Sequence, residues 1–162
     1  MKIVVFSDAH GNQAAIEHIL YLNEDADYII SLGDAEVTEK FLVDHDIVMI
    51  KGNSSRDPGF VYESDLLVEG KKLFLTHGHK YKVGKGIDRL VKRVAHGEYD
   101  LALYGHTHVA AIDQIMKIDF INPGSCASPR NSLPPTYLII NIQEGVMTYT
   151  FKEAIDNNTI EV

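Results

Sequence analysis

Residues 28–53, YIISLGDAEVTEKFLVDHDIVMIKGN, contain two apolar runs, and each run ends in a glycine followed by a polar residue. The runs, Tyr28–Leu32 and Asp46–Lys51, are short and rich in β-branched side chains, which predicts strands that are buried on both faces. Between them, Thr38–Asp44 predicts a short helix. The stretch therefore predicts a strand-helix-strand unit with parallel strands.

A further apolar run precedes this unit. Lys2–Ser7 is again rich in β-branched residues and predicts a third buried strand. Apolar residues at helical spacing follow within Ala15–Leu20, and Asn12 is suited to cap that helix. The first third of the chain thus predicts alternating strands and helices, the pattern of a parallel sheet with helices packed on it.

The rest of the chain is mostly predicted strand. Asp65–Val68 and Lys72–Thr76 flank a Glu-Gly-Lys turn and predict a hairpin, and Ile87–Val94 predicts an amphipathic helix. Further strands are expected at Leu101–Tyr104, Ala110–Ile115, Lys117–Ile121, Thr136–Ile142 and Val146–Phe151. A two-sheet α/β sandwich, with mixed sheets flanked by helices, accommodates both halves, whereas a single doubly wound sheet does not.

Composition and charge exclude several classes of protein. The chain has 162 residues, 45% of them hydrophobic and 23% charged, which excludes a disordered chain and predicts one domain over residues 1–162. No apolar run approaches the ~20 residues of a membrane-spanning helix, and the N-terminus lacks the features of a signal peptide. The net charge of −8 disfavours non-specific binding to nucleic acid or membranes. With the single cysteine, Cys126, these features predict a cytoplasmic protein.

Side chains that commonly bind metal ions follow five of the predicted strands. They are Asp8, His10, Asp34, Asn53, His77, His106 and His108. Because ligands of open α/β sheets bind outside the carboxyl ends of the strands, we expect these side chains to share one edge. Asp8 and His10 are two residues apart, as are His106 and His108, so on extended segments each pair points to one side.

Seven such ligands suit two metal ions better than one. A single four-coordinate ion leaves ligands over, whereas two ions can share a bridging carboxylate. Nitrogen and oxygen donors without a thiolate favour Mn²⁺, Fe²⁺, Zn²⁺, Co²⁺ or Ni²⁺ over Ca²⁺ and do not choose among them. We expect Mn²⁺ first, with the other four ions and Mg²⁺ as alternatives.

The order of these motifs resembles a known enzyme family. Asp8-x-His10, Gly33-Asp34, Gly52-Asn53, His77-Gly78-His79 and Gly105-His106-x-His108 look like the ordered signature of the calcineurin-like metallophosphoesterases. Together with Asn122-Pro123-Gly124-Ser125, they look most like the small bacterial and archaeal phosphodiesterases of that superfamily. The match runs from residue 8 to about residue 130 and covers most of the chain.

The resemblance implies a role for each matching residue. One metal ion would be held by Asp8, His10, Asp34 and His108, and the other by Asp34, Asn53, His77 and His106, with Asp34 bridging. It also implies hydrolysis of a phosphodiester by a bridging water that attacks phosphorus in line. The expected substrate is a small phosphodiester. Nucleic acid is a disfavoured alternative substrate, because Tyr81 is the one candidate base-stacking side chain in Lys71–Arg93, where basic residues are concentrated.

One position departs from the family pattern. Many members have a histidine directly after the asparagine, where it protonates the leaving group or steadies the phosphate, and here that residue is Ser54. His79 is the candidate catalytic acid in its place, the alternative being a structural histidine. Ser54 and Arg130 are candidates for substrate binding, because arginine forks suit phosphate oxygens, and a solvent-exposed role is the alternative for Arg130. His18 and His96, on predicted helices, and His45, near a helix end, are expected to be ordinary surface or partly buried residues.

Basic residues are unevenly distributed. Eight of the 15 lysines and arginines lie between Lys71 and Arg93, a segment that includes His77. A basic rim near the metal ions would attract phosphodiesters, and a solvated helix face is the alternative reading.

Two other functions fit the same residues. One is a non-catalytic scaffold on the same fold, like the retromer subunit that resembles these enzymes, although a scaffold has no need to retain all seven ligands. The other is a phosphomonoesterase, which differs only in how the pocket treats the second ester group. Exposed strands late in the chain also allow pairing into a homo-oligomer.

Overall fold

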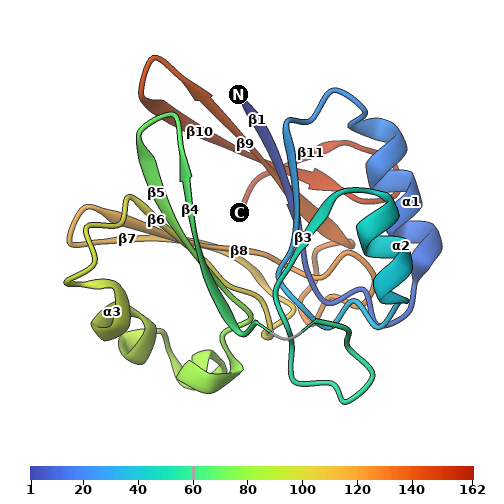
Figure 1. Cartoon of the computed structure of the whole chain (residues 1–162), viewed down its shortest axis with the longest axis horizontal. Helices are drawn as coiled ribbons and strands as arrows, with labels where there is room; N and C mark the ends of the chain where they lie inside the picture. The colour runs from blue at the N-terminus through green and yellow to red at the C-terminus, as the bar shows by residue number, and fades with distance from the viewer. Residues whose placement is uncertain (60) are drawn as a thin grey trace.

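Two β-sheets face each other in the computed structural model, which describes residues 1–59 and 61–162 (Figure 1). The first sheet has the order β11-β10-β9-β1-β2-β3. Its strands are β1 (Lys2–Phe6), β2 (Tyr28–Ser31), β3 (Ile47–Met49), β9 (Thr136–Gln143), β10 (Val146–Glu153) and β11 (Thr159–Ile160). β1, β2 and β3 run parallel, and β9 pairs with the other side of β1 in the antiparallel direction. The predicted strand-helix-strand unit is therefore confirmed.

The second sheet has the order β4-β5-β6-β8-β7 and is also mixed. Its strands are β4 (Glu63–Val68), β5 (Lys71–Thr76), β6 (Leu101–Leu103), β7 (Ala110–Ile115) and β8 (Ile118–Pro123). The hairpin β4–β5 is antiparallel, whereas β5, β6 and β8 run parallel. The two-sheet α/β sandwich predicted from the sequence is the fold of the protein.

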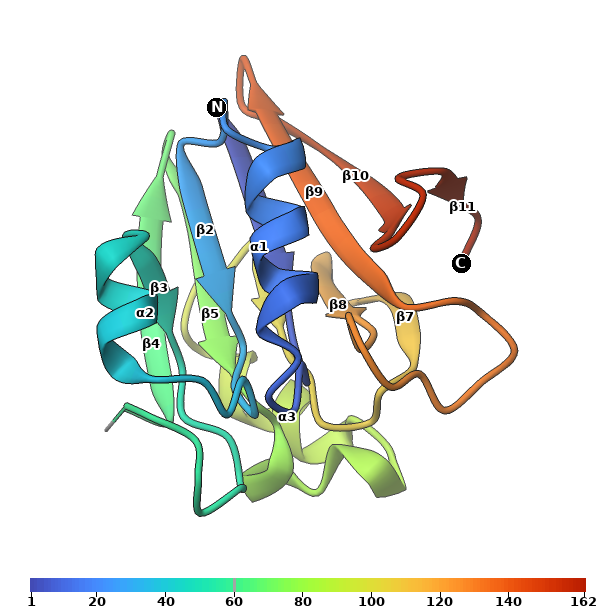
Figure 2. The same cartoon turned by 90° about the vertical axis from the view of Figure 1, so that its right-hand side faces the viewer.

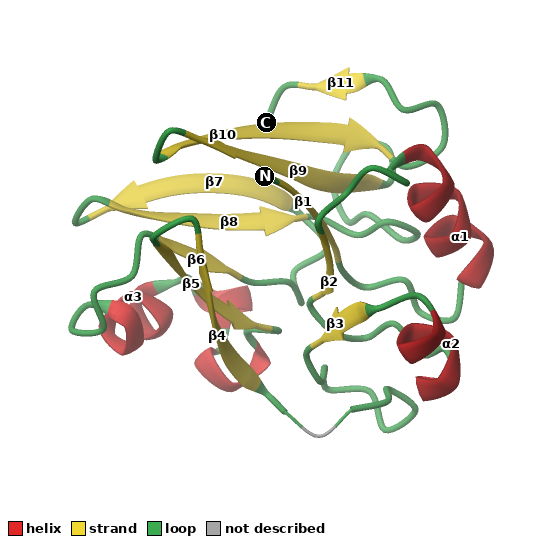
Figure 3. Ribbon diagram, turned by 45° about the horizontal axis from the view of Figure 1, so that its top comes forward, coloured by secondary structure: helices red, strands yellow, loops and turns green. Residues whose placement is uncertain are grey.

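Helices cover the outer faces of the sandwich (Figures 2 and 3). α1 (Gln13–Leu22) and α2 (Glu39–Asp44) lie on the first sheet, with Asn12 and Thr38 as their N-caps. The second sheet is covered by two short 3₁₀ turns, η1 (His79–Tyr81) and η2 (Val83–Lys85), and by α3 (Asp88–Val94). No helix in the part of the chain that the structure describes is long and apolar enough to cross a membrane.

Alternation along the strands explains why their sequences are continuously apolar. In β1, Ile3 and Val5 pack into the core between the sheets, while Val4 and Phe6 pack toward α1. In β5, Leu75 faces the other sheet and Phe74 lies beneath α3. Successive strand side chains point to opposite faces, so a strand covered on both sides needs apolar residues at every position.

Three details differ from the sequence-based expectation. The two 3₁₀ turns and β11 were not anticipated, because each is only two or three residues long and carries no periodic pattern. His96 lies in a turn just beyond α3 rather than on the helix, since α3 ends at Val94. From the sequence, the loop Ser54–Phe60 is also expected to form a wall of the pocket, and its last residue, Phe60, lies outside the described residues.

Candidate metal centre

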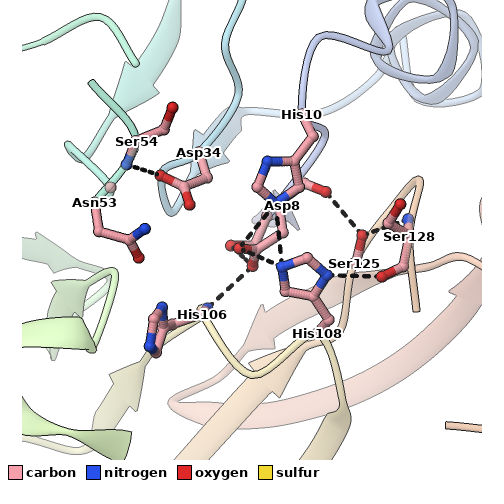
Figure 4. Close-up of polar contacts among 12 residues, drawn as sticks. Asp8, His10, Asp34, Asn53, Ser54, His106, His108, Ser125 and Ser128 are labelled. Carbon is pink, nitrogen blue, oxygen red and sulfur yellow. Dashed lines mark hydrogen bonds and ion pairs between the residues drawn. The ribbon is translucent and has the colours of Figure 1, made fainter. Parts of the chain in front are cut away.

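Loops that follow strands of both sheets come together at the predicted ligands, and Figure 4 shows Asp8, His10, Asp34, Asn53, His106 and His108 close to one another. The backbone N–H of Asp8 donates to the carbonyl of Gly33 at 3.0 Å, which joins the loops after β1 and β2. The backbone N–H of Gly105 donates to the carbonyl of His77 at 3.1 Å, which joins the loops after β6 and β5. His77 Nδ1 lies 2.8 Å from the carbonyl oxygen of Leu32, so the two sheets are linked directly through a predicted ligand.

The ligand loops turn tightly instead of running extended. The expectation that Asp8 and His10, and likewise His106 and His108, share a side because their segments are extended is therefore wrong. Asp8, His10, Asp34, His106 and His108 all have positive φ, between 46° and 71°. Aspartate and histidine tolerate this left-handed region better than most residues, but it remains strained. The Asp8–His10 and His106–His108 pairs therefore converge through tight turns, where strain of this kind is common in functional sites.

Glycines before the ligands allow the loops to approach closely. A side chain at Gly52 would collide with the carboxylate and backbone of Asp34, and one at Gly105 would collide with the hydroxyl of Ser7. Neither of these two glycines has positive φ, so close packing rather than unusual backbone geometry explains them. The glycine motifs thus bring Asp34 against the loop after β3 and Asp8 against the loop after β6.

One group of close ligand atoms comprises Asp8, His10 and His108, and we call it the exposed group. The Nε2 atoms of His10 and His108 are 3.1 Å apart, and they lie 3.9 and 3.3 Å from Asp8 Oδ1. Asp8 is fully buried, His108 is nearly so, and the His10 side chain is 32% exposed. This group therefore opens to solvent through His10.

The hydrogen bonds of these imidazoles leave Nε2 free to bind a cation. His108 Nδ1 faces the carbonyl of Ser128 at 2.7 Å, and His10 Nδ1 faces the carboxylate of Glu36 at 2.8 Å. Such partners place the proton on Nδ1, so each Nε2 carries a lone pair. Two neutral rings whose lone pairs face each other at 3.1 Å can be bridged by a cation. Asp8 Oδ1 is buried and lacks a hydrogen-bond partner among the described residues, so the donor set fits a divalent metal ion.

A second group comprises Asp8, Asp34 and His77, all buried, and we call it the buried group. His77 Nε2 lies 3.6 Å from Asp34 Oδ2, 3.9 Å from Asp8 Oδ1 and 3.2 Å from Asn53 Oδ1. Its Nδ1 is held by the Leu32 carbonyl, so Nε2 is again the free ligand atom. Carboxylate oxygens, an amide oxygen and an imidazole nitrogen together fit a second divalent ion.

The two groups share Asp8, although the family resemblance gives the bridging role to Asp34. Asp8 Oδ1 is within 4 Å of three imidazole nitrogens, whereas Asp34 Oδ1 accepts a hydrogen bond of 2.8 Å from the backbone N–H of Ser54. Burial raises the pKa of Asp8, but the neighbouring His108 and His77 imidazoles outweigh it and keep that pKa below its ordinary value. The bridging role of Asp34 stays a prediction.

His106 belongs to neither group but lies beside both. Its ring centroid is 5.2 Å from that of His77, and its backbone N–H donates to Asp8 Oδ2 at 3.0 Å. Burial lowers the pKa of His106, and the neighbouring His77 charge lowers it further, which favours the neutral form that binds metal ions. The structure therefore brings all seven predicted ligands to one edge, five of them in the two close groups and Asn53 and His106 next to them.

Sequence analysis missed Asp57, which organises two of the ligand loops. Its buried carboxylate accepts four backbone hydrogen bonds: Oδ2 from Asp34 at 2.9 Å and Gly52 at 2.6 Å, and Oδ1 from Ala35 at 2.8 Å and Glu36 at 3.2 Å. The loops after β2 and β3 are thereby held together through one side chain. Only its place next to Pro58, in the loop after Asn53, could have drawn attention to it.

Sequence analysis also missed Glu36, the partner of His10. Its side chain is 5% exposed, pairs with Arg56 and hydrogen-bonds His10. The hydrogen bond with His10 is the largest influence on the carboxyl and keeps the pKa of Glu36 below its ordinary value. A carboxylate behind a ligating imidazole is a common arrangement at metal sites, because it fixes the ring and its tautomer.

The remaining candidates lie around the ligands in different roles. The Ser54 backbone supports Asp34, and its hydroxyl oxygen accepts from the Arg56 N–H at 3.3 Å. Arg130 is exposed, and its backbone N–H donates to the carbonyl of His108 at 3.1 Å, which places it next to a ligand. Burial, aided by the neighbouring His77 and His106 imidazoles, lowers the pKa of His79 to about 4, so the ring is neutral at pH 7.

The other histidines and the Asn-Pro-Gly-Ser segment have structural contacts. His18 and His45 bind backbone carbonyls of Ile155 and Phe41, away from the ligands. Asn122 donates to the Gly105 carbonyl and the Thr107 hydroxyl, and the Ser125 hydroxyl donates to the Asp8 carbonyl at 2.7 Å. The segment thus supports the ligand loops without supplying a ligand.

Comparison with known proteins agrees with this geometry. The family model of the calcineurin-like phosphoesterase superfamily domain matches residues 1–145. The chain is 30% identical to phosphodiesterase YfcE of Escherichia coli, with 85% of each chain covered.

Two solved structures have the same fold. A Streptococcus pneumoniae protein described as a predicted phosphoesterase superposes with a TM-score of 0.88 at 26% identity, covering 98% of this chain and 92% of that one. Vps29 from Entamoeba histolytica, solved with bound zinc, has a TM-score of 0.77 at 18% identity, covering 99% and 96%. At that identity the likeness to Vps29 concerns the fold alone.

Proposed function

Because the chain belongs to the calcineurin-like phosphoesterase superfamily, we propose that it is a metal-dependent phosphodiesterase that uses two divalent ions. The observation that carries the proposal is the convergence of carboxylates and imidazoles at one sheet edge, where a buried Asp8 oxygen without a hydrogen-bond partner among the described residues and two facing Nε2 atoms can bind a cation. The name of the E. coli relative, a phosphodiesterase, supports the substrate class.

Each ion would be held by a mixed set of oxygen and nitrogen ligands. One would bind Asp8, His10, Asp34 and His108, and the other Asp34, Asn53, His77 and His106. When bound, such ions lower the pKa of a bridging water that attacks phosphorus and neutralise the phosphoryl oxygens. Mn²⁺ is the ion we expect first, and the N/O donor set also admits Fe²⁺, Zn²⁺, Co²⁺, Ni²⁺ and Mg²⁺.

Residues outside the ligand set would position the substrate. Arg130 is exposed and its backbone binds the carbonyl of His108, so its guanidinium can pair with a phosphoryl oxygen. Ser54 borders the Asp34 loop and is half-buried, which suits a supporting contact to the same group. Both would stabilise the extra negative charge that develops as the water attacks.

His79 would assist departure of the leaving group through its ring N–H. Its ring lies 5.4 Å from that of His77 and 6.2 Å from that of His106, at the margin of the ligand cluster. A ring with a pKa of about 4 is almost entirely unprotonated at pH 7, so it is a weak general acid. The rate should therefore depend steeply on the pKa of the leaving group.

Turnover of chromogenic esters tests the proposal. Protein treated with EDTA should be inactive on bis(p-nitrophenyl) phosphate and regain activity with Mn²⁺. The monoester p-nitrophenyl phosphate should be cleaved at least about tenfold less efficiently if the diester is preferred. A preference for the monoester would make the protein a phosphomonoesterase. Metal binding without turnover of either ester would make it a scaffold on the phosphoesterase fold.

We also infer that the substrate is a small phosphodiester and that the reaction takes place in the cytoplasm. Assembly through β7 or β11, which lie at the edges of the two sheets, is an open expectation.

A further inference from the structure

A charged groove begins at the metal centre and leads away from it over the 3₁₀ turns. One hollow of about 320 Å³ is lined by His79, Lys82, Gly84, Lys85 and His106. A second, also about 320 Å³, shares the walls Lys82 and Lys85 and continues along α3 past Arg89 and Lys92. We call the four cations Lys82, Lys85, Arg89 and Lys92 the basic groove.

The cations of the basic groove differ from the other basic residues nearby. Lys71, Lys72 and Arg93, in the same part of the sequence, pair with Asp100, Asp65 and Glu63. The four groove cations are exposed and form no ion pair with any described residue, and Asp88 is the one acidic side chain on their wall. The groove therefore gathers positive charge that the protein itself leaves unbalanced.

The turns beneath the groove are anchored in the core. Val83, between the two lysines, is 4% exposed and packs with Phe74 and Leu90 under the second sheet. Lys82 has φ of 56° and donates its backbone N–H to His79, and the N–H of Lys85 donates to the Lys82 carbonyl at 2.8 Å. The backbone that carries the two lysines is thus fixed relative to His79, at the edge of the metal centre.

We propose that the basic groove binds a second anionic group, such as a phosphate, on one ester substituent of a small phosphodiester. The inference rests on the proposed function, because it takes the scissile phosphate to lie at the metal centre. Lysines present charge without demanding one geometry, so a phosphate at the end of a flexible substituent suits them. The substrate class would then be diesters with an additional phosphate, such as those of a nucleoside bisphosphate.

A nucleic-acid strand fits the groove less well. Binding a strand without sequence preference relies on exposed aromatic faces for stacking as well as on cations. The Tyr81 hydroxyl donates to Glu63 and its ring is half-buried, and the Tyr62 ring is covered by the Lys80 ammonium at 3.4 Å. The groove offers charge near the metal centre but not a stacking platform.

Two chromogenic substrates that differ in one phosphate test the proposal. Thymidine 5′-(p-nitrophenyl phosphate) and its 3′-phosphorylated form release the same leaving group from the same diester. In the wild type, the 3′-phosphate should raise kcat/KM by at least about fivefold, the scale of two exposed ion pairs. The advantage should shrink as ionic strength rises, because exposed charges are screened.

Charge-removing variants identify the residues responsible. Lys82→Gln with Lys85→Gln should abolish the advantage of the 3′-phosphate, and Arg89→Gln with Lys92→Gln should reduce it less. The matched control is Lys40→Gln with Lys152→Gln, which changes the net charge equally. Lys40 lies on α2 and Lys152 on β10, both in the half of the molecule built on the first sheet, whereas the groove lies over the second. The control should retain the advantage, and thermal unfolding should show that every variant folds.

Each outcome separates the groove from the proposed function. Equal kcat/KM on both esters, or an equal loss on both in the lysine variant, would overturn the proposal that the groove binds a second phosphate. The proposed phosphodiesterase function would be unaffected. In a different outcome, a short oligonucleotide inhibits more tightly than thymidine 3′,5′-bisphosphate and loses this inhibition in the lysine variant. That result would overturn the proposal and show that the groove binds a nucleic-acid strand. If neither ester is cleaved, the proposed function fails. Calorimetric binding of thymidine 3′,5′-bisphosphate, weakened by the lysine variant and stronger than binding of the 5′-monophosphate, would still support the groove.

Discussion

The exposed group and the buried group use the same kinds of ligand but support them differently. His77, in the buried group, is fully enclosed and its Nδ1 is held by a backbone carbonyl. His10, in the exposed group, is 32% exposed and is held by the side chain of Glu36. A backbone partner inside the core can move only if the sheets move, whereas an exposed side-chain partner can rotate away. The comparison therefore indicates that, when no ion is bound, the geometry of the buried group is more rigid than that of the exposed group.

The carboxylates decide whether the two groups work as one centre, and their loss should have the largest effect. Asp34→Ala should reduce turnover of bis(p-nitrophenyl) phosphate by at least about 10³-fold and bound Mn²⁺ from about two ions per chain to fewer than one. Elemental analysis of the dialysed protein measures the second quantity. If Asp34→Ala keeps one ion and Asp8→Ala keeps none, the shared ligand is Asp8, as the distances around its Oδ1 suggest.

The histidines test the difference between the groups directly. His77→Ala should lower kcat by at least about 10²-fold at any Mn²⁺ concentration, because its fully buried position is closed to solvent water that could replace the imidazole. His10→Ala should lower activity as much at low Mn²⁺ but recover part of it at high Mn²⁺, since water can enter there. His18→Ala, His45→Ala and His96→Ala serve as controls and should stay within about threefold of the wild type. A titration in which both variants recover alike would remove the distinction.

Asp57 should matter most for the buried group. Asp57→Asn keeps one acceptor oxygen and turns an NH₂ group toward two backbone donors, so two of the four hydrogen bonds are lost. We expect Mn²⁺ affinity to fall by about 30- to 100-fold, in the range found for residues that orient metal ligands. Asp156→Asn, at an exposed loop position, is the matched control. A variant that loses thermal stability but binds Mn²⁺ normally would make Asp57 purely structural.

Glu36 should have a smaller effect that is confined to the exposed group. Glu36→Ala removes the hydrogen bond that holds the His10 ring, and we expect about tenfold weaker binding of one Mn²⁺ while the other is unaffected. Glu36→Gln keeps an acceptor oxygen for His10 and should restore most of the affinity. Glu24→Ala removes an exposed carboxylate elsewhere and controls for net charge. Calorimetric titration that shows both sites weakened equally would contradict the assignment of Glu36 to one group.

The sequence predicted the sandwich and the ligand edge because both rest on local patterns. Apolar runs such as Lys2–Ser7 define buried strands, and the residue after each run falls at a strand end. The support around the ligands could not be predicted in this way. Asp57 binds backbone groups of residues that lie 5 to 23 positions away, and only the folded loops bring them together. The left-handed turns at Asp8 and His106 were missed because no motif distinguishes them from extended segments.

Ser54, at the position where the family resemblance leads us to expect a histidine, should give the smallest effect. Ser54→His places an imidazole next to Asn53, and positioned acid catalysis is typically worth 10²–10⁴-fold, so partial recovery should raise the rate at least about fivefold on a diester with a poor leaving group. The gain should shrink on bis(p-nitrophenyl) phosphate, because nitrophenolate departs without a proton. His79→Ala, alone and combined with Ser54→His, shows whether the two rings act on the same step. The Ser54 hydroxyl oxygen accepts from Arg56 and its backbone N–H binds Asp34, so a substitution that slows both substrates equally would mean that the new ring disturbs Asp34 instead of reaching the leaving group.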